Sequence, residues 1–183
     1  METGHGNFGQ FLWRTTAAHM IGYTVAGLLA LVFKGYGTAF ETGLAAVVMR
    51  PVDAPIVALG PALQFIPGAA LALILYPFRG IFLTGRGGWL RLLLLIGGLS
   101  LFNPQVPGPG NFEGLLYTNF SPAEHALGLP EQICYSILFS GGLCLWHRRP
   151  GRAWNVAAAA ALILIALMSL LGTLSALGLL PGA

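Results

Sequence analysis

The feature that most constrains this chain is a set of apolar stretches long enough to cross a lipid bilayer. The first of them, FLWRTTAAHMIGYTVAGLLALVF, occupies residues 11–33. A helix needs about 20 predominantly apolar residues to cross the hydrocarbon core of a membrane. No cationic segment precedes this stretch, and it is longer than the apolar core of a signal peptide, so we expect a retained first span.

Further apolar stretches follow, and charged residues make up only 8% of the chain. A soluble domain has about 25% charged residues, so most of this surface is not suited to water. We therefore expect an all-α fold, a single polytopic transmembrane helical bundle over residues 1–183. The expected spans lie at about 10–33, 54–77, 88–102, 129–146 and 153–179. The piece LAAVVM (44–49) is too short to cross, so region 41–50 is expected to be interfacial or re-entrant.

Prolines and a capping motif predict where two of these helices bend or begin. Pro61 and Pro67 lie inside the second span with Gln64 between them, so this helix is expected to be kinked. The sequence SPAE (121–124) matches a capping box. It predicts a short interfacial helix that stops near Gly128, before the fourth span.

Basic residues predict the orientation of the chain. Loops 78–88 and 147–153 are rich in arginine, whereas loop 103–124 contains neither lysine nor arginine. Cytoplasmic loops of membrane proteins carry the excess of positive charge. We expect a protein of the bacterial inner (plasma) membrane with its N-terminus in the cytoplasm and its C-terminus outside.

The first span carries a polar stripe. Thr15, His19 and Tyr23 recur every four residues and therefore share one face of the helix. Ionisable side chains inside a span are costly and are functional candidates by default. One interpretation is hydrogen bonding between helices in the bundle interior. The other is a ligand-binding or catalytic site, in which His19 acts as acid, base or hydrogen-bond partner with Tyr23 beside it.

Arg14 and Arg79 are candidate ligand-binding arginines. Arg14 lies four residues from the polar end of the first span. Its side chain either snorkels to the cytoplasmic headgroups or forms an inward ion pair. Arg79 follows the second span, where it either binds a lipid phosphate or acts only as a topology signal.

The outer loop provides the remaining candidates, Glu113, Tyr117 and His125. Glu113 precedes Tyr117 by four residues and is either an acid/base catalyst or a partner for a neighbouring cation. His19 and His125 are expected to differ in depth by half a membrane thickness, which argues against a haem held by two histidines.

The cysteine spacing and the positions of the basic residues limit which ligands and kinds of site are expected. Cys134 and Cys144 are ten residues apart in one apolar stretch, or about 15 Å along a helix, so they cannot pair with each other. The two cysteines are expected to be small core residues, so we expect no metal site. We expect no nucleic-acid binding, because the basic residues lie at span ends. The identity of any cofactor stays open, haem is not expected, and a bound lipid is one candidate ligand.

Several short phrases stand out: RTTAAHMIGY (14–23), LYPFRG (75–80), GWLRL (88–92), PGPGNFEGLLYTN (107–119) and HALGLPEQ (125–132). In these phrases the chain resembles a group of small multi-pass bacterial membrane proteins. The resemblance covers most of the chain and implies a multi-pass membrane fold. It implies no activity.

Three kinds of function remain open. The first is a non-catalytic accessory or scaffold subunit of a membrane complex, or a protein that self-associates through the small residues of 153–179. The second is an intramembrane enzyme or binder of a lipid, quinone or other apolar ligand that uses His19, Tyr23 and Glu113. The third is a small transporter or channel built around the kinked second span. The lack of a catalytic set favours the first, with the lipid bilayer and other membrane subunits as partners.

Overall fold

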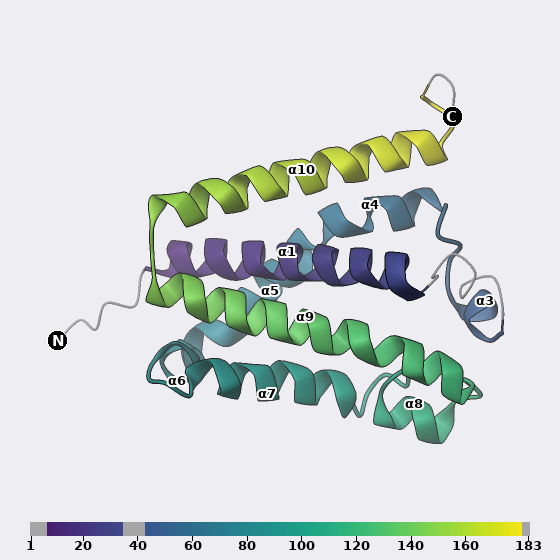
Figure 1. Cartoon of the computed structure of the whole chain (residues 1–183), viewed down its shortest axis with the longest axis horizontal. Helices are drawn as coiled ribbons and strands as arrows, with labels where there is room; N and C mark the ends of the chain where they lie inside the picture. Colours follow the sequence, from purple (N-terminus) through teal and green to yellow (C-terminus); the bar gives the residue numbers. More distant parts are fainter. Residues whose placement is uncertain (1–6, 35–42, 181–183) are drawn as a thin grey trace.

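The computed structural model describes residues 7–34 and 43–180, and over those residues it contains helices and no strand (Figure 1). In chain order the elements are α1 (Phe8–Lys34), α3 (Ala45–Val48), α4 (Pro55–Leu63), α5 (Phe65–Leu75), η1 (Tyr76–Phe78), α6 (Arg79–Leu83), α7 (Gly88–Leu101), α8 (Phe112–Tyr117), α9 (Pro122–Arg148) and α10 (Arg152–Ala176). The all-helical expectation is confirmed for this part of the chain.

Among the described residues, three helical segments are long and apolar enough to cross a membrane. They are Phe8–Val32, Pro55–Leu83 and Arg152–Ala176. α7 is apolar but has only 14 residues. α9 has 27 residues, but glutamates and a histidine lie in its N-terminal part. The fold is therefore compatible with a membrane protein. The number of spans depends on whether α7 and α9 also cross the membrane.

The second long segment is interrupted at Gln64. α4 ends at Leu63 and α5 begins at Phe65, and Gln64 between them has φ −65° and ψ −7°. Pro61 lies inside α4 and has no backbone N–H to donate within the helix. At this interruption the Gln64 side chain contacts His19 of α1, in the site described below.

The expected short helix that stops near Gly128 is wrong, because α9 continues without a break to Arg148. The capping box itself is confirmed: the Glu124 N–H donates to Ser121 Oγ at 3.3 Å, and the Ser121 N–H donates to Glu124 Oε2 at 2.6 Å. Gly128 serves another purpose. A Cβ at this position would lie 2.6 Å from the carbonyl oxygen of Pro109, so glycine lets the preceding loop pass close to α9.

Several short helices lie between the long ones, among them α3, α6 and α8. α3 falls within the piece 44–49, and its relation to a membrane stays a prediction, while residues 35–42 lie outside the described part of the chain. α8 was not expected. Asn111 caps it, since its Oδ1 accepts from the Gly114 N–H at 2.7 Å and the Gly108 N–H at 3.1 Å.

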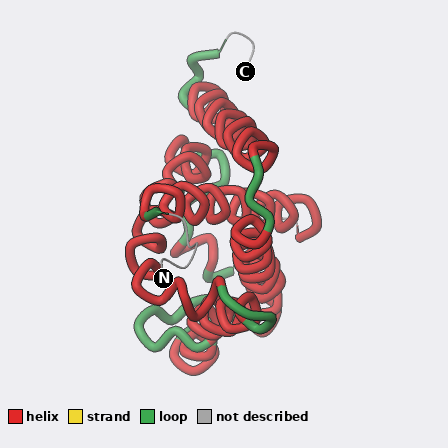
Figure 2. Tube along the Cα trace, turned by 90° about the vertical axis from the view of Figure 1, so that its left-hand side faces the viewer, coloured by secondary structure: helices red, strands yellow, loops and turns green. Residues whose placement is uncertain are grey.

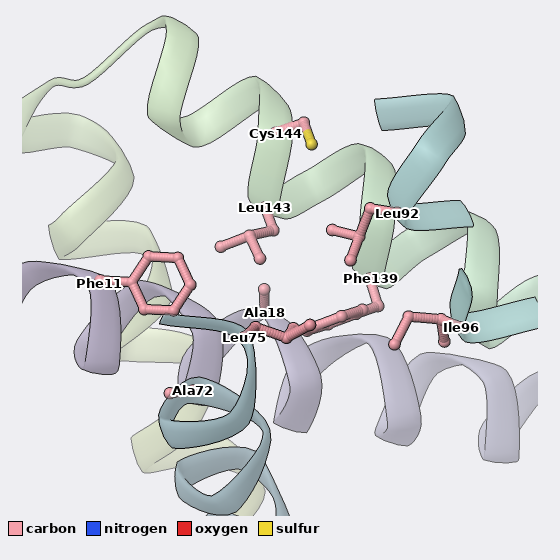
Figure 3. Close-up of a cluster of buried hydrophobic side chains, with 9 residues drawn as sticks. All are labelled: Phe11, Ala18, Ala72, Leu75, Leu92, Ile96, Phe139, Leu143 and Cys144. Atoms are coloured by element: carbon pink, nitrogen blue, oxygen red, sulfur yellow. The ribbon is translucent and has the colours of Figure 1, made fainter. Parts of the chain in front are cut away.

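The main apolar core lies between α1, α5, α7 and α9 (Figure 3). Its buried members are Phe11, Ala18, Ala72, Leu75, Leu92, Ile96, Phe139, Leu143 and Cys144. In a bilayer, such a core is held together by close packing, because lipid tails are as apolar as the side chains themselves. The core therefore fixes how the four helices are arranged around the polar site.

α10 packs against α4 and α1 at the edge of the bundle (Figure 2). A Cβ at Gly172 would lie 3.4 Å from the Cβ of Ala58, so the two helices are close here. Ser169 is buried, and its carbonyl accepts from Thr173 Oγ1 at 2.7 Å. Part of the small-residue face of α10 is therefore used within the chain.

The long helices run back and forth between two ends of the molecule (Figure 1). One end, which we call the arginine end, holds Arg79, Arg86, Arg91, Arg148, Arg149 and Arg152. Arg148 links its two loops, because Nη2 donates to the Gly85 carbonyl at 2.6 Å. Asp53, Glu113 and Glu124 belong to segments at the opposite end.

Candidate functional site

His19 lies in the interior of the bundle, only 6% exposed, and contacts two other helical segments. Its Nδ1 is 2.6 Å from the Tyr135 hydroxyl, and its Nε2 is 3.0 Å from Gln64 Oε1. Because an amide oxygen only accepts, His19 Nε2 donates to Gln64, and Nδ1 accepts from the Tyr135 O–H. Both ring nitrogens of a neutral imidazole are thus occupied by protein side chains.

The close approach of α5 to α1 at this level depends on Gly68. A Cβ at Gly68 would lie 3.1 Å from the Cα of Thr16 and 3.2 Å from Cδ2 of His19. Small residues allow helices to approach in this way. A larger residue at position 68 would push α5 away from α1 and would carry Gln64, one turn earlier, with it.

Aromatic rings hold the His19 imidazole from the side. Tyr135 stacks on Phe139 with ring centroids 5.8 Å apart and planes at 14°. The His19 ring meets both edge-on, at 5.5 Å from Tyr135 and 6.3 Å from Phe139. Edge-to-face packing at these distances is favourable, so the Tyr135 hydroxyl is held in position for its hydrogen bond.

The three members of the predicted stripe differ in burial. Thr15 is fully buried and His19 nearly so, whereas Tyr23 is 38% exposed. The Tyr23 ring still lies near His19, with centroids 6.3 Å apart. The stripe therefore faces the interior at Thr15 and His19 and reaches the surface of the bundle at Tyr23.

Several buried hydroxyls on α1 and α9 have no hydrogen-bond partner among the described residues, and two of them belong to fully buried residues. These two are Thr15 Oγ1 and Ser140 Oγ. Thr15 lies one turn before His19 on α1, and Ser140 lies five residues after Tyr135 on α9. Leaving a buried polar group unpaired costs about 1–3 kcal/mol, so these two hydroxyls are a local cost to the stability of the bundle.

Arg14 is buried nearer the arginine end. Its guanidinium carbon lies 6.0 Å from the centre of the Trp146 ring, within range of a cation–π interaction. Beside it, Trp13 Nε1 donates to Asn155 Oδ1 at 3.1 Å. The partner that the structure shows for Arg14 is an aromatic ring of α9, which neither of the two sequence-based interpretations named.

Glu113, Tyr117 and His125 lie apart from the site around Tyr135. Glu113 is in the first turn of α8, and Tyr117 at its end is 74% exposed. His125 is buried, and its Nδ1 accepts from the Gly110 N–H at 3.1 Å. Ten residues, or about 15 Å of helix, separate His125 from Tyr135 along α9. The structure therefore does not bring these three candidates to the first-span stripe.

Arg79 lies at the arginine end, at the start of α6. Its guanidinium carbon is 4.1 Å from the centre of the Tyr76 ring, and Nη1 donates to the Tyr76 carbonyl at 3.0 Å. Phe8 and Phe11 of α1 pack edge-on against the same ring, at 4.9 and 5.5 Å. This arginine is thus held against the body of the bundle.

Sequence reasoning missed Tyr135 and Ser140, and it named Gln64 only as the residue at a break. A signal was present in the fourth expected span, where polar residues recur every three or four positions: Gln132, Tyr135, Ser136 and Ser140. Such spacing indicates one polar helix face. It could have been paired with the stripe on the first span.

Taken together, these features describe a helical protein with many exposed apolar side chains and a polar site inside, and they are compatible with a membrane protein. Compared with known proteins, the chain matches no family model, no curated protein and no solved structure. Within residues 7–34 and 43–180, no three His, Cys, Asp or Glu side chains lie together as a metal site. The function is therefore argued from the chain's own residues.

Proposed function

We propose that this protein is a multi-pass integral membrane protein that serves as a non-catalytic accessory or scaffold subunit of a membrane complex. The observation that carries the proposal is the hydrogen bonding of His19 to both Tyr135 and Gln64. A general acid or base needs a nitrogen that can reach its substrate. Here both nitrogens link α1 to two other helical segments, so the site holds the bundle together.

The proposed topology has five crossings: α1, α4 with α5, α7, α9 and α10, which alternate in direction (Figure 1). The 14 residues of α7 extend about 21 Å, short of the ~30 Å hydrocarbon core. Local thinning of the bilayer and anchoring by flanking residues such as Trp89 and Arg91 accommodate a short span. The break at Gln64 supports a kinked second span.

The proposed orientation places the arginine end in the cytoplasm of a bacterial cell. α1 begins at this end, since Phe8 packs against Tyr76. α10 ends at the opposite end (Figure 1). With five crossings, the N-terminus is inside and the C-terminus outside.

The proposed partner surface is formed by α10 and α4. Among the residues of α10, only Ala158, Ile165 and Ser169 are buried, and α4 has no buried residue. A second membrane subunit or a second copy of the chain would pack on the outer face of α10, where Leu164 is 60% exposed.

Native mass spectrometry of the full chain in lipid nanodiscs tests the proposal. We expect a homo-oligomer or a co-purifying membrane subunit. Leu164→Trp on α10 is expected to reduce this association, and Leu94→Trp on α7, where Leu94 is 66% exposed, is the matched control. A monomer that co-purifies with no partner would contradict a scaffold function.

A second candidate function is binding of a lipid, quinone or other apolar ligand in the polar site. The unpartnered hydroxyls of Thr15 and Ser140 favour it. Mass spectrometry of an organic extract of the purified protein should then contain one ligand in stoichiometric amount, which is lost in Thr15→Val. An extract without such a molecule would count against this function.

A further inference from the structure

The arginine end concentrates positive charge from three segments of the chain. The bond from Arg148 to the Gly85 carbonyl holds the end of α9 against the loop before α7. Arg91 Nη1 donates to the Ile81 carbonyl at 3.2 Å in the same region. The carboxylates of the described segments belong to the opposite end or, for Glu131, to the N-terminal half of α9. The described residues therefore leave this positive charge without a neutralising carboxylate.

Arg79 is the arginine best prepared to bind an anion here. One N–H is used on the Tyr76 carbonyl, and the guanidinium is stacked on the Tyr76 ring. Arg79 Nε is buried and has no hydrogen-bond partner among the described residues. An arginine has five N–H donors in a rigid fork, so several remain for an incoming oxygen. Phe8 and Phe11 pack against the Tyr76 ring, on which the Arg79 guanidinium is stacked. The Arg79 side chain therefore loses little conformational entropy when it binds an anion.

Tryptophans and apolar side chains mark this end as the level of lipid headgroups. Trp89 and Trp154, 40% and 39% exposed, lie at the starts of α7 and α10. Tryptophan is enriched at membrane–water interfaces. Close to Arg79 in the chain, Phe78 and Ile81 are 52% and 51% exposed. They offer apolar contact to acyl chains below a headgroup.

We propose that the arginine end binds the phosphodiester of an anionic phospholipid, with Arg79 as the principal contact. Arginine recognises phosphate through paired N–H donors, which a lysine does not reproduce. The exposed Phe78 and Ile81 favour a lipid over free phosphate, because they add contacts that only an acyl chain can make. The inference rests on the proposed insertion of the chain in a membrane.

The test is native mass spectrometry of the full chain in detergent, supplied with equal amounts of phosphatidylglycerol and phosphatidylcholine that have the same acyl chains. We expect phosphatidylglycerol to be retained about fivefold better, the factor expected for one cationic contact. Arg79→Gln should abolish this preference and Arg79→Lys should restore it only in part. Arg50→Gln, at an exposed arginine of the opposite end, should leave it unchanged. Inorganic phosphate added as a competitor should not displace the lipid.

Equal retention of the two lipids by the unaltered chain would overturn the inference, and so would equal effects of Arg79→Gln and Arg50→Gln. Displacement of the lipid by inorganic phosphate would also overturn it. Melting temperatures measured without added lipid show whether each variant is folded. Failure of membrane insertion would appear differently, as release of the chain from membranes by alkaline carbonate.

Discussion

His19 shows how one ionisable residue can be satisfied inside an apolar bundle. Its two hydrogen bonds join α1 to Gln64 at the helix break and to Tyr135 of α9. Hydrogen bonds between membrane helices contribute about 0.6 kcal/mol on average and about 1.7 kcal/mol at most. The pair of bonds is thus a modest but specific contribution that fixes which helix faces meet.

Replacement of His19 should destabilise the bundle more than loss of one of its partners. We expect His19→Phe to cost about 2 kcal/mol, because it leaves the Tyr135 hydroxyl and the Gln64 oxygen unpaired. Tyr135→Phe should cost about 1 kcal/mol, and Tyr117→Phe, at an exposed tyrosine, close to nothing. Unfolding in mixed detergent micelles measures the order. Equal stability of the three variants would contradict the role of His19.

The absence of a side chain at Gly68 allows α5 to approach α1 closely. Gly68→Ala places a Cβ 3.1 Å from the Cα of Thr16, so α5 must move and stability should fall by about 1–3 kcal/mol. Gly60→Ala in α4 is the matched control, since nothing lies within 4 Å of its added Cβ. It should be neutral or stabilising through helix propensity. The difference in melting temperature between the two variants is the measurement, and a loss of stability in Gly60→Ala alone would refute the close approach.

The inward orientation of Thr15 and His19 could be inferred from the sequence, but their surroundings could not. A spacing of four residues shows that side chains share a helix face. It does not show which face of which other helix lies opposite. Tyr135 is 116 positions away from His19 in sequence, and only the packing of the whole bundle brings the two together.

At the scale of elements, α9 shows that a glycine in the sequence can mark a helix end or can make room for a neighbouring segment. The SPAE capping box correctly predicted a helix start. Gly128 was interpreted as a helix end, since glycine is common there. In the structure this glycine lies within α9 and admits the backbone of Pro109, and Gln132 Nε2 donates to the same Pro109 carbonyl at 3.1 Å. The sequence alone cannot distinguish a glycine needed for conformation from one needed for space.

This difference can be measured within one helix. Gly128→Ala should push the loop at Pro109 away from α9 and cost about 1–3 kcal/mol. Gly142→Ala, with nothing within 4 Å of its added Cβ, should be neutral or slightly stabilising. Hydrogen exchange of residues 106–114 reports the displacement directly. Unchanged exchange in Gly128→Ala would show that the loop does not depend on this glycine.

At the scale of the whole molecule, composition predicted an apolar helical bundle, and the charges predicted its two different ends. The structure brings the arginines of loops 78–88 and 147–153 together through Arg148. It supports three membrane-spanning helices by length and apolar character. The two further crossings that we propose, α7 and α9, do not follow from hydropathy, because α7 is short and α9 carries polar side chains.

In the proposed topology the chain crosses a membrane with its arginine end in the cytoplasm. Labelling of introduced cysteines in intact bacterial cells with a membrane-impermeant maleimide tests it, in a background in which Cys134 and Cys144 are replaced by alanine. Exposed positions are available at both ends: Gly87 and Pro150 at the arginine end, and Gln105 and Asn119 in the loop between α7 and α9.

We predict that Gln105→Cys and Asn119→Cys react in intact cells, whereas Gly87→Cys and Pro150→Cys react only after lysis. This pattern requires both α7 and α9 to cross the membrane and places the arginines inside. Labelling of Gln105→Cys and Pro150→Cys from the same side of the membrane would contradict this topology.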